Sequence, residues 1–338
     1  MRVHITNVYG LSGTAAKAQQ AVVNIARRML HCHELGIYHY QVESDTPELL
    51  HMRLSGIMAS VDFRDIVIFQ VPTWNGIKFD LALLEQFMRY KCHNIIFVHD
   101  VTPLMFEENR YLLDVYIDLY NRADVLIVPS QPMVEFLYSN GLNVKKVVVQ
   151  RMWDYMVFLE ERKRPPFKRV IHFAGNPNVE SKFGFVKKWN YANVPLSVTT
   201  DDGEWAEERN IRFLGWHNDY NLLVNTLRKN GGVGLLWSED SYWREYMKMN
   251  ACYKMSTYLA AGLPIIVPRG IAEQDTVVRK GLGFVVGSLD EAVERVEGMD
   301  KKEYENMTRN VEDFSKLLRN GYFTKKVLLD AMFEIFDA

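Results

Sequence analysis

Short apolar runs alternate with amphipathic stretches along most of this 338-residue chain. Apolar runs such as 65–71, 94–98 and 123–128 are each followed by a polar loop. Strands that alternate with helices in this way form βαβ units and parallel sheets. The pattern therefore predicts an α/β protein.

The alternation stops at a basic, proline-containing segment, Arg162–Arg169, and then starts again. Proline disfavours helix and sheet interiors, so this segment is predicted to be a linker. Before it we expect strands at 3–8, 65–71, 94–98, 123–128 and 146–150 and a helix at 15–30. After it we expect strands at 170–174, 196–200, 211–214, 232–237 and 282–286 and helices at 183–189, 289–296, 302–318 and 324–336. Two Rossmann-like halves are predicted, with ligands outside the carboxyl ends of their strands.

Composition narrows the class of protein. Hydrophobic residues make up 48% and charged residues 24%, which predicts a packed core. A net charge of −2 gives no general attraction to nucleic acid or an anionic membrane. Cys32, Cys92 and Cys252 have no metal-binding spacing and fit a reducing compartment. No signal peptide or run of roughly 20 apolar residues is visible, so we expect a soluble, cytoplasmic protein.

The segment from Asn250 to Val267 carries the most chemistry. It predicts a helix that opens near Asn250, ends at Gly262 and leads into a buried strand. Asn250 and Lys254 would share one face near the helix start. A helix N-terminus with an added ammonium suits a diphosphate. In a two-domain α/β chain this indicates a nucleotide-sugar glycosyltransferase.

Several strings of the chain also resemble one enzyme family. The two halves and the segment Tyr253–Pro264 resemble the GT-B glycosyltransferases, whose two Rossmann-like domains face a central cleft. Other strings resemble, more specifically, the cytoplasmic glucosyltransferases that extend O-linked GlcNAc on serine-rich-repeat adhesins of streptococci and lactobacilli. These strings are Phe69–Asn75, Val98–Phe106, Arg151–Asp154, His172–Pro177 and Arg319–Thr324.

The resemblance implies the substrates and the domain roles. It implies a UDP-sugar donor, with glucose the first choice of sugar, and a GlcNAc-modified serine-rich adhesin as acceptor. It implies no cofactor, no catalytic metal and a homo-oligomer, expected to be a tetramer. Residues 1–158 would bind the acceptor and residues 159–318 the UDP-sugar, while 319–338 would form a helix that crosses back to the first domain.

The resemblance places a run of UDP contacts at Asn250, Ala251, Cys252, Tyr253, Lys254 and Met255. The Lys254 ammonium would meet the β-phosphate as the sugar bond breaks and charge builds there. Asn250 could instead be only an N-cap of the helix, and the two roles are compatible. Cys252 and Met255 suit backbone contact or core packing better than side-chain chemistry.

Further donor contacts are predicted at strand ends. Gly13 and Thr14 lie on the first strand-to-helix turn, where glycine permits close approach and the hydroxyl can bind a phosphate or sugar. A turn glycine and an N-cap threonine explain them as well. Lys182 matches a position where the family has an arginine. A lysine there keeps the positive charge but cannot bind a phosphate in the bidentate way of arginine. Asn176 is the other polar candidate, and Trp216 could stack on uracil or fill core space.

The acceptor is predicted to lie against the first half. His99 and Asp100 follow a central strand, and either could take the proton of the acceptor hydroxyl in an inverting transfer. Asp100 could instead bond the backbone of the following turn. Trp74 and Asn75 suit a sugar, through an aromatic face and an amide, although core packing explains Trp74 too.

Three functions remain open at this stage. The first is a UDP-sugar-dependent hexosyltransferase. The second is a catalytically silent GT-B subunit that binds glycopeptide for a partner transferase, since a fold does not determine function. The third is a sugar-nucleotide epimerase on the same fold.

Overall fold

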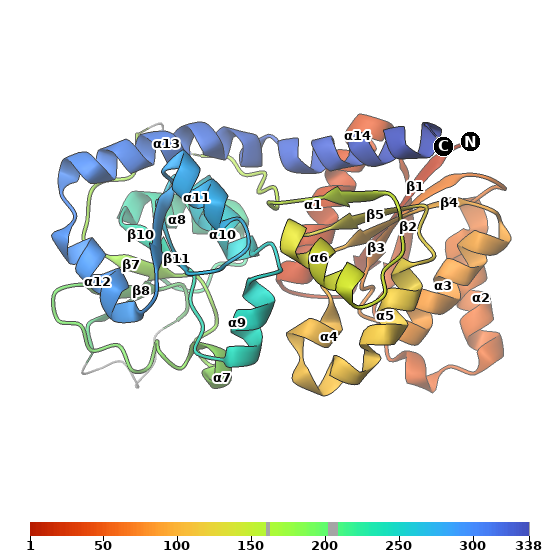
Figure 1. Cartoon of the computed structure of the whole chain (residues 1–338), viewed down its shortest axis with the longest axis horizontal. Coiled ribbons are helices and arrows are strands. Elements are labelled where there is room, and N and C mark those ends of the chain that lie inside the picture. Colours follow the sequence, from red (N-terminus) through yellow and green to blue (C-terminus); the bar gives the residue numbers. More distant parts are fainter. Residues whose placement is uncertain (160–162, 202–208, 338) are drawn as a thin grey trace. The chain divides into compact units, whose positions relative to one another are not determined.

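The computed structural model describes residues 1–159, 163–201 and 209–337 (Figure 1). It divides into two compact units. Unit 1 comprises Met1–Arg151 together with Phe323–Ala338, and unit 2 comprises Met152–Tyr322. Arg162 of the predicted linker lies outside the described residues.

Unit 1 contains a six-stranded parallel sheet in the order β2-β1-β3-β4-β5-β6. Its strands are β1 (Val3–Tyr9), β2 (His33–Tyr38), β3 (Ile66–Val71), β4 (His93–Val98), β5 (Val125–Val128) and β6 (Val147–Val149). All six residues of β3 are buried, as expected for a strand covered on both faces. The strand order reverses at β1, which pairs with β2 on one side and with β3 on the other.

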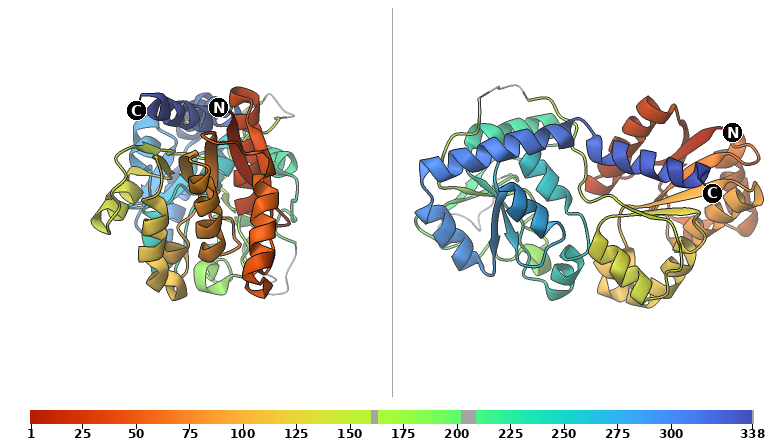
Figure 2. Two further views of the ribbon diagram at one scale, coloured as in Figure 1. Left: turned by 90° about the vertical axis from the view of Figure 1, so that its right-hand side faces the viewer. Right: turned by 45° about the horizontal axis from the view of Figure 1, so that its top comes forward.

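Helices cover this sheet. They are α1 (Thr14–Leu30), α2 (Pro47–Ile57), α3 (Ile77–Arg89), α4 (Thr102–Met105), α5 (Leu113–Tyr120) and α6 (Gln131–Ser139), with 3-10 turns at Val42–Ser44, Met58–Ser60 and Glu107–Leu112. Right-handed crossovers place α1 on one face and α2, α3, α5 and α6 on the other. The contact between α2 and α3, which Figure 2 shows side by side, agrees with this arrangement.

The last helix, α14 (Tyr322–Phe336), belongs to unit 1 for nearly all its length. Its Val327, Leu328 and Ala331 side chains are buried. Near its start, Gln150 Nε2 donates to Thr324 Oγ1 over 3.3 Å, next to the end of β6. Chain segments about 170 residues apart in sequence therefore complete one core.

Unit 2 contains a second six-stranded parallel sheet, in the order β12-β11-β10-β7-β8-β9. Its strands are β7 (Ile171–Phe173), β8 (Leu196–Val198), β9 (Ile211–Phe213), β10 (Val233–Leu235), β11 (Ile265–Pro268) and β12 (Gly283–Val286). The chain passes outward through β8 and β9 and then returns to place β10 on the other side of β7. The reversal point therefore lies between β7 and β10.

The helices of unit 2 are α7 (Glu180–Phe183), α8 (Tyr220–Asn230), α9 (Ser241–Met247), α10 (Tyr253–Ala260), α11 (Gln274–Lys280), α12 (Leu289–Gly298) and α13 (Lys301–Arg319). The predicted helix at 183–189 is wrong, because α7 ends at Phe183 and turns follow it. Trp189 is buried there instead, and its Nε1 donates to Val194 O over 3.0 Å. Helix α10 packs against α13 and α8.

The described residues include no helix long and apolar enough to cross a membrane.

Candidate functional site

The reversal point of the unit 2 sheet is bordered by a glycine. Gly175 follows β7, and a Cβ atom at this position would lie 2.6 Å from Phe173 Cζ and 3.1 Å from Lys254 Cε. The absence of a side chain therefore lets the Lys254 stem lie against the backbone. In open parallel sheets ligands bind at this point, outside the carboxyl ends of the strands.

Tyr258 holds α10 at this place. Its hydroxyl accepts a hydrogen bond from Ala174 N at 2.6 Å and donates to Leu235 O at 3.2 Å. These two residues lie at the ends of β7 and β10, so one side chain joins both strands to the helix. Burial raises the pKa of Tyr258 far above neutrality, so the hydroxyl keeps its proton. Tyr258 lies one turn after Lys254 and positions it, a role that the sequence alone did not indicate.

The Lys254 ammonium has aromatic rings as its neighbours. Its Nζ lies 5.0 Å from the centroid of Phe183 and 5.9 Å from that of Phe173. Among the described residues, no carboxylate lies within ion-pair distance of it. Cation–π contacts offset only a part of the hydration that a half-buried ammonium loses. The side chain is thus a cation for which a bound anion would be a favourable partner.

Lys182, which was predicted to precede the helix at 183–189, lies in α7 and brings a second cation to the same strand end. Its Nζ lies 3.6 Å from the ring centroid of Trp243. Its carbonyl accepts hydrogen bonds from Ser238 Oγ at 2.9 Å and Glu239 N at 3.2 Å. The short helix is therefore joined to the segment after β10. Asn176 is exposed in the preceding turn, where its Oδ1 accepts from Asn178 N at 3.0 Å.

The start of α10 differs from the prediction. The helix begins at Tyr253 with Cys252 as N-cap, and no side chain caps it by a hydrogen bond. Asn250 is therefore neither the N-cap nor on a common helical face with Lys254. Its backbone N–H instead donates to Tyr246 O at 2.9 Å, which continues the turn after α9.

The other members of the predicted run mostly pack inward. Ala251 and Met255 are buried, and Ala251 O accepts from Trp153 Nε1 at 2.8 Å. The Tyr253 ring lies 5.3 Å from that of Tyr155. A ligand at this segment would meet backbone and the Lys254 side chain, while the side chains of these three residues support it from behind.

Trp216 is 58% exposed, which rules out core filling, one of the two alternatives left open for it. Its Nε1 donates to Asn218 Oδ1 at 2.8 Å, and its backbone N–H donates to Asp201 Oδ1 at 3.1 Å. The ring is held beyond the end of β9, and it remains available for stacking.

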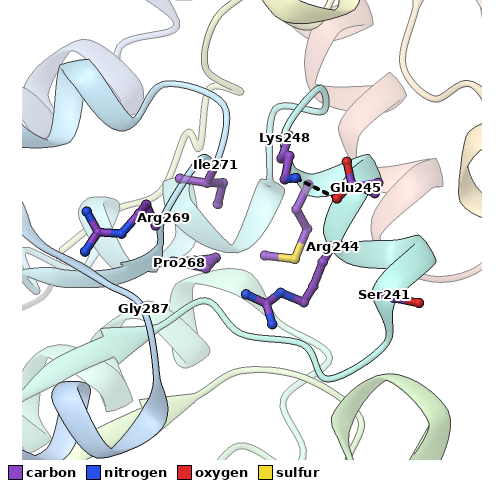
Figure 3. Close-up of a pocket in the computed structure, with 9 residues that line it drawn as sticks. Ser241, Arg244, Glu245, Lys248, Pro268, Arg269, Ile271 and Gly287 are labelled. Carbon is purple, nitrogen blue, oxygen red and sulfur yellow. Dashed lines mark hydrogen bonds and ion pairs between the residues drawn. The ribbon is translucent and has the colours of Figure 1, made fainter.

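Unit 2 also contains a pocket of about 430 Å³ at the carboxyl ends of β11 and β12 (Figure 3). In it Lys248 forms an ion pair with Glu245 at 2.6 Å, whereas Arg244 and Arg269 have no ion-pair partner among the described residues. No residue predicted to bind the donor lines this pocket, which is separate from the β7–β10 reversal point. Its lining residues are Ser241, Arg244, Glu245, Met247, Lys248, Pro268, Arg269, Ile271 and Gly287.

The reversal point of the unit 1 sheet lies between β1 and β3. The turn that contains Gly13 and Thr14 follows β1, and the loop Pro72–Asn75 follows β3. Gln19 Nε2 in α1 donates to Pro72 O at 2.8 Å and joins the two. Gly13 has φ of 87° and is the N-cap itself, so Thr14 is the first helical residue and the N-cap prediction for it is wrong.

Asn75 has a structural role. Its Oδ1 accepts from Tyr40 N at 3.0 Å and lies 3.2 Å from His39 Nδ1, while its Nδ2 donates to Tyr38 O at 3.1 Å. The predicted sugar contact through this amide does not fit, because the buried side chain is committed to the segment after β2. Trp74 is partly exposed and has φ of 64°.

The His99 side chain does not suit a catalytic base. It is buried, and burial lowers its pKa to about 3. Its Nε2 lies 2.8 Å from Gln70 Oε1, and Gln70 Nε2 in turn donates to Thr6 O at 2.6 Å. The neutral imidazole thus belongs to a polar chain that crosses the sheet. Asp100, the next residue, is only partly buried and stays the predicted base.

A buried carboxyl supports the loop after β3. Asp80 in the first turn of α3 accepts hydrogen bonds from Thr73 Oγ1 and, over 3.4 Å, from Thr73 N. Burial raises its pKa to about 7. The loop that carries Trp74 is therefore held from both sides, by α1 and by α3.

Within residues 1–159, 163–201 and 209–337, no three His, Cys, Asp or Glu side chains are grouped so as to hold a metal ion. Metal independence stays a prediction.

The chain matches known proteins over its whole length. Residues 2–152 match the glucosyltransferase 3-like N-terminal domain and residues 171–331 the corresponding C-terminal domain. The chain is 44% identical over 340 residues to Glucosyltransferase 3 of Streptococcus gordonii, and 40% identical over 343 residues to Glucosyltransferase 3 of Streptococcus parasanguinis. Each alignment covers 99% of both proteins.

A solved structure supports the fold. Anabaena Alr3699/HepE in complex with UDP and glucose matches with a TM-score of 0.67 at 11% identity, over 98% of this chain and 99% of that one. The expected GT-B fold and glycosyltransferase class are confirmed. The chain belongs to the glucosyltransferase 3-like family.

Proposed function

We propose that the protein transfers glucose from UDP-glucose to GlcNAc that is O-linked to a serine-rich adhesin. Two relatives that align over almost their entire length are named glucosyltransferases, and a protein of the same fold binds UDP and glucose. The observation that carries the proposal is the Lys254 ammonium beside the backbone at Gly175, with no acidic partner among the described residues.

The donor chemistry follows from this arrangement. When the bond between the glucose anomeric carbon and the β-phosphate breaks, negative charge builds on the diphosphate. The positive end of α10 and the Lys254 ammonium stabilise that charge, and neither must reorganise during the reaction. Lys182 adds a second cation, and Trp216 offers a surface on which uracil stacks. Gly13 and Thr14 of unit 1 remain proposed donor contacts.

Unit 1 binds the acceptor in this proposal. A hydroxyl oxygen of GlcNAc attacks the anomeric carbon, and in an inverting transfer the Asp100 carboxylate accepts the hydroxyl proton. UDP leaves as the new glycosidic bond forms. Trp74 packs against the sugar, while Asn75 holds the loop that carries it.

Mass spectrometry tests this function directly. A GlcNAc-modified serine-rich peptide is incubated with UDP-glucose, UDP-galactose or UDP-GlcNAc, and we expect one added hexose with UDP-glucose. A peptide without GlcNAc is the control. No added mass from any donor would refute the proposal. Consumption of UDP-sugar without acceptor would indicate an epimerase, and failure to bind UDP in calorimetry would indicate a silent subunit.

We further propose a metal-independent, cytoplasmic homotetramer. Metal independence and the tetramer rest on the sequence resemblance, and the location rests also on the sparse cysteines. Unchanged transfer in excess EDTA and a fourfold subunit mass in light scattering are the expected results. Loss of transfer in EDTA, or a monomer mass, would contradict them.

A further inference from the structure

Tyr38 ends β2 and lies flat on a glycine. A Cβ atom at Gly10 would lie 2.8 Å from both Cε2 and Cζ of the Tyr38 ring, so only glycine leaves room for the ring there. Gly10 has φ of 75°, a conformation that also favours glycine. One face of the ring covers the turn after β1, and the residue is still 69% exposed.

The backbone that carries this ring is well anchored. Asn75 Nδ2 donates to Tyr38 O at 3.1 Å, and Asn75 Oδ1 accepts from Tyr40 N at 3.0 Å. His39 N donates to Tyr9 O at 2.7 Å, which extends the ladder between β1 and β2 by one residue. Because the backbone is held on both sides of Tyr38, little conformational entropy is left to lose when a ligand covers the ring.

The ring also lies one strand away from the reversal point between β1 and β3. Strands β2 and β3 flank β1, so Tyr38 and Trp74 lie on opposite sides of the turn after β1. Single exposed aromatic residues are common and need no function. Tyr38 differs in two ways: its ring rests on a glycine, and Asn75 joins its backbone to the loop that carries Trp74. It also lies at the carboxyl ends of the strands, where ligands of such sheets bind.

We propose that Tyr38 is a stacking platform for a pyranose ring of the acceptor saccharide. The C–H face of a pyranose is apolar and packs on an aromatic ring, while its hydroxyls stay at the rim. This inference rests on the proposed function and adds a binding residue to the acceptor side. The phenol oxygen is not required, since the ring face makes the contact.

Steady-state kinetics of Tyr38→Ala and Tyr38→Phe test the platform. A ring contact of this kind corresponds to roughly a three- to tenfold change in affinity. We expect Tyr38→Ala to raise the KM for the GlcNAc-peptide by that factor and Tyr38→Phe to leave it within twofold. The KM for UDP-glucose and the Kd for UDP should not change in either variant.

Tyr90→Ala is the matched control. Tyr90 is 40% exposed. It lies between α3 and β4, at the amino ends of the strands, whereas Tyr38 lies at their carboxyl ends. It should leave every constant unchanged. An unchanged KM for the peptide in Tyr38→Ala would overturn the proposal, and so would a rise in the KM for UDP-glucose instead, because the ring would then contact the donor.

Direct binding separates this inference from the proposed reaction. A calorimetric titration of the GlcNAc-peptide needs no turnover. Weaker binding to Tyr38→Ala than to wild type supports the platform, even if wild type transfers no sugar. Equal binding to wild type and Tyr38→Ala refutes the platform, even if transfer is observed.

Discussion

Replacement of Lys254 by alanine separates catalysis from stability. The ammonium has no ion pair among the described residues and only two ring contacts, at 5.0 and 5.9 Å. Such contacts contribute about 0.5–1 kcal/mol each when they are partly exposed. Two such contacts amount to about 1–2 kcal/mol, so the melting temperature should fall by no more than about 8 °C.

The expected loss of activity is much larger. One unit charge about 4 Å from a phosphate contributes on the order of 4 kcal/mol at the effective dielectric constant near a protein surface. Removal of one donor to a developing oxyanion costs about 2.7–4 kcal/mol in comparable sites. We therefore expect Lys254→Ala to lower kcat by roughly 100- to 1,000-fold.

The assay follows UDP release with saturating GlcNAc-peptide, alongside a thermal melt of each variant. Lys316→Ala is the control, because this lysine belongs to unit 2, its side chain is 60% exposed, and it pairs with Asp313 at 2.7 Å. It should change neither quantity. Lys254→Arg retains the charge beside Gly175, so its kcat should be at least tenfold higher than that of Lys254→Ala. Folded Lys254→Ala with a rate within tenfold of wild type would refute the electrostatic reasoning.

Three further variants test the supporting structure. Burial raises the pKa of Asp80 from 3.8 to about 7. The carboxyl therefore destabilises the fold progressively as the pH rises from 4 to 7, and its effect is constant below and above that range. As the pH rises from 4 to 8, the free energy of unfolding of Asp80→Asn, measured with urea, should therefore increase by up to about 4 kcal/mol relative to that of wild type. A difference between the two proteins that does not change with pH would contradict this. Glu312→Ala leaves the buried Arg228 guanidinium, 3.1 Å away, without its carboxylate, and unfolding of unit 2 should become easier by about 3–5 kcal/mol; a melting temperature equal to that of wild type would argue against it. Gly175→Ala places a methyl group 2.6 Å from the buried Phe173 ring, so UDP binding in calorimetry should weaken at least tenfold, and an unchanged Kd would show that the ligand lies elsewhere.

The pattern of the sequence predicted most strands, because a strand buried on both faces is apolar at every position. Strand β3 is apolar except at Gln70, and β4 is apolar after its first two residues, His93 and Asn94. Strand β2 was missed, because it lies at the sheet edge, contains a glycine and alternates buried and exposed positions over only part of its length. The helix at 183–189 failed for a different reason: the apolar residues there fill the core from turns.

The candidate site was predicted in its residue types more than in its geometry. Lys254 was found because it lies near a predicted helix start, in a segment that resembles the UDP-binding run of the family; a lysine alone would more often be an exposed helical residue. The helix boundary was misplaced by three residues, since the sequence does not show that Trp153 bonds Ala251 O and holds that segment out of the helix. His99 was predicted as a candidate base because the sequence does not show whether a histidine after a strand is exposed or buried.

By itself, the sequence determined most of the strands and several of the helices, and it placed a cation next to a helix start. These are properties of local periodicity and residue type, which short stretches of chain express independently. Only the tertiary structure decided that Lys254 has no acidic partner in the described part of the chain, that His99 is neutral and buried, and that Tyr38 covers Gly10. Each of these depends on side chains from strands that are neighbours in the sheet and distant in sequence, and burial and pairing of this kind arise only when the sheet has formed.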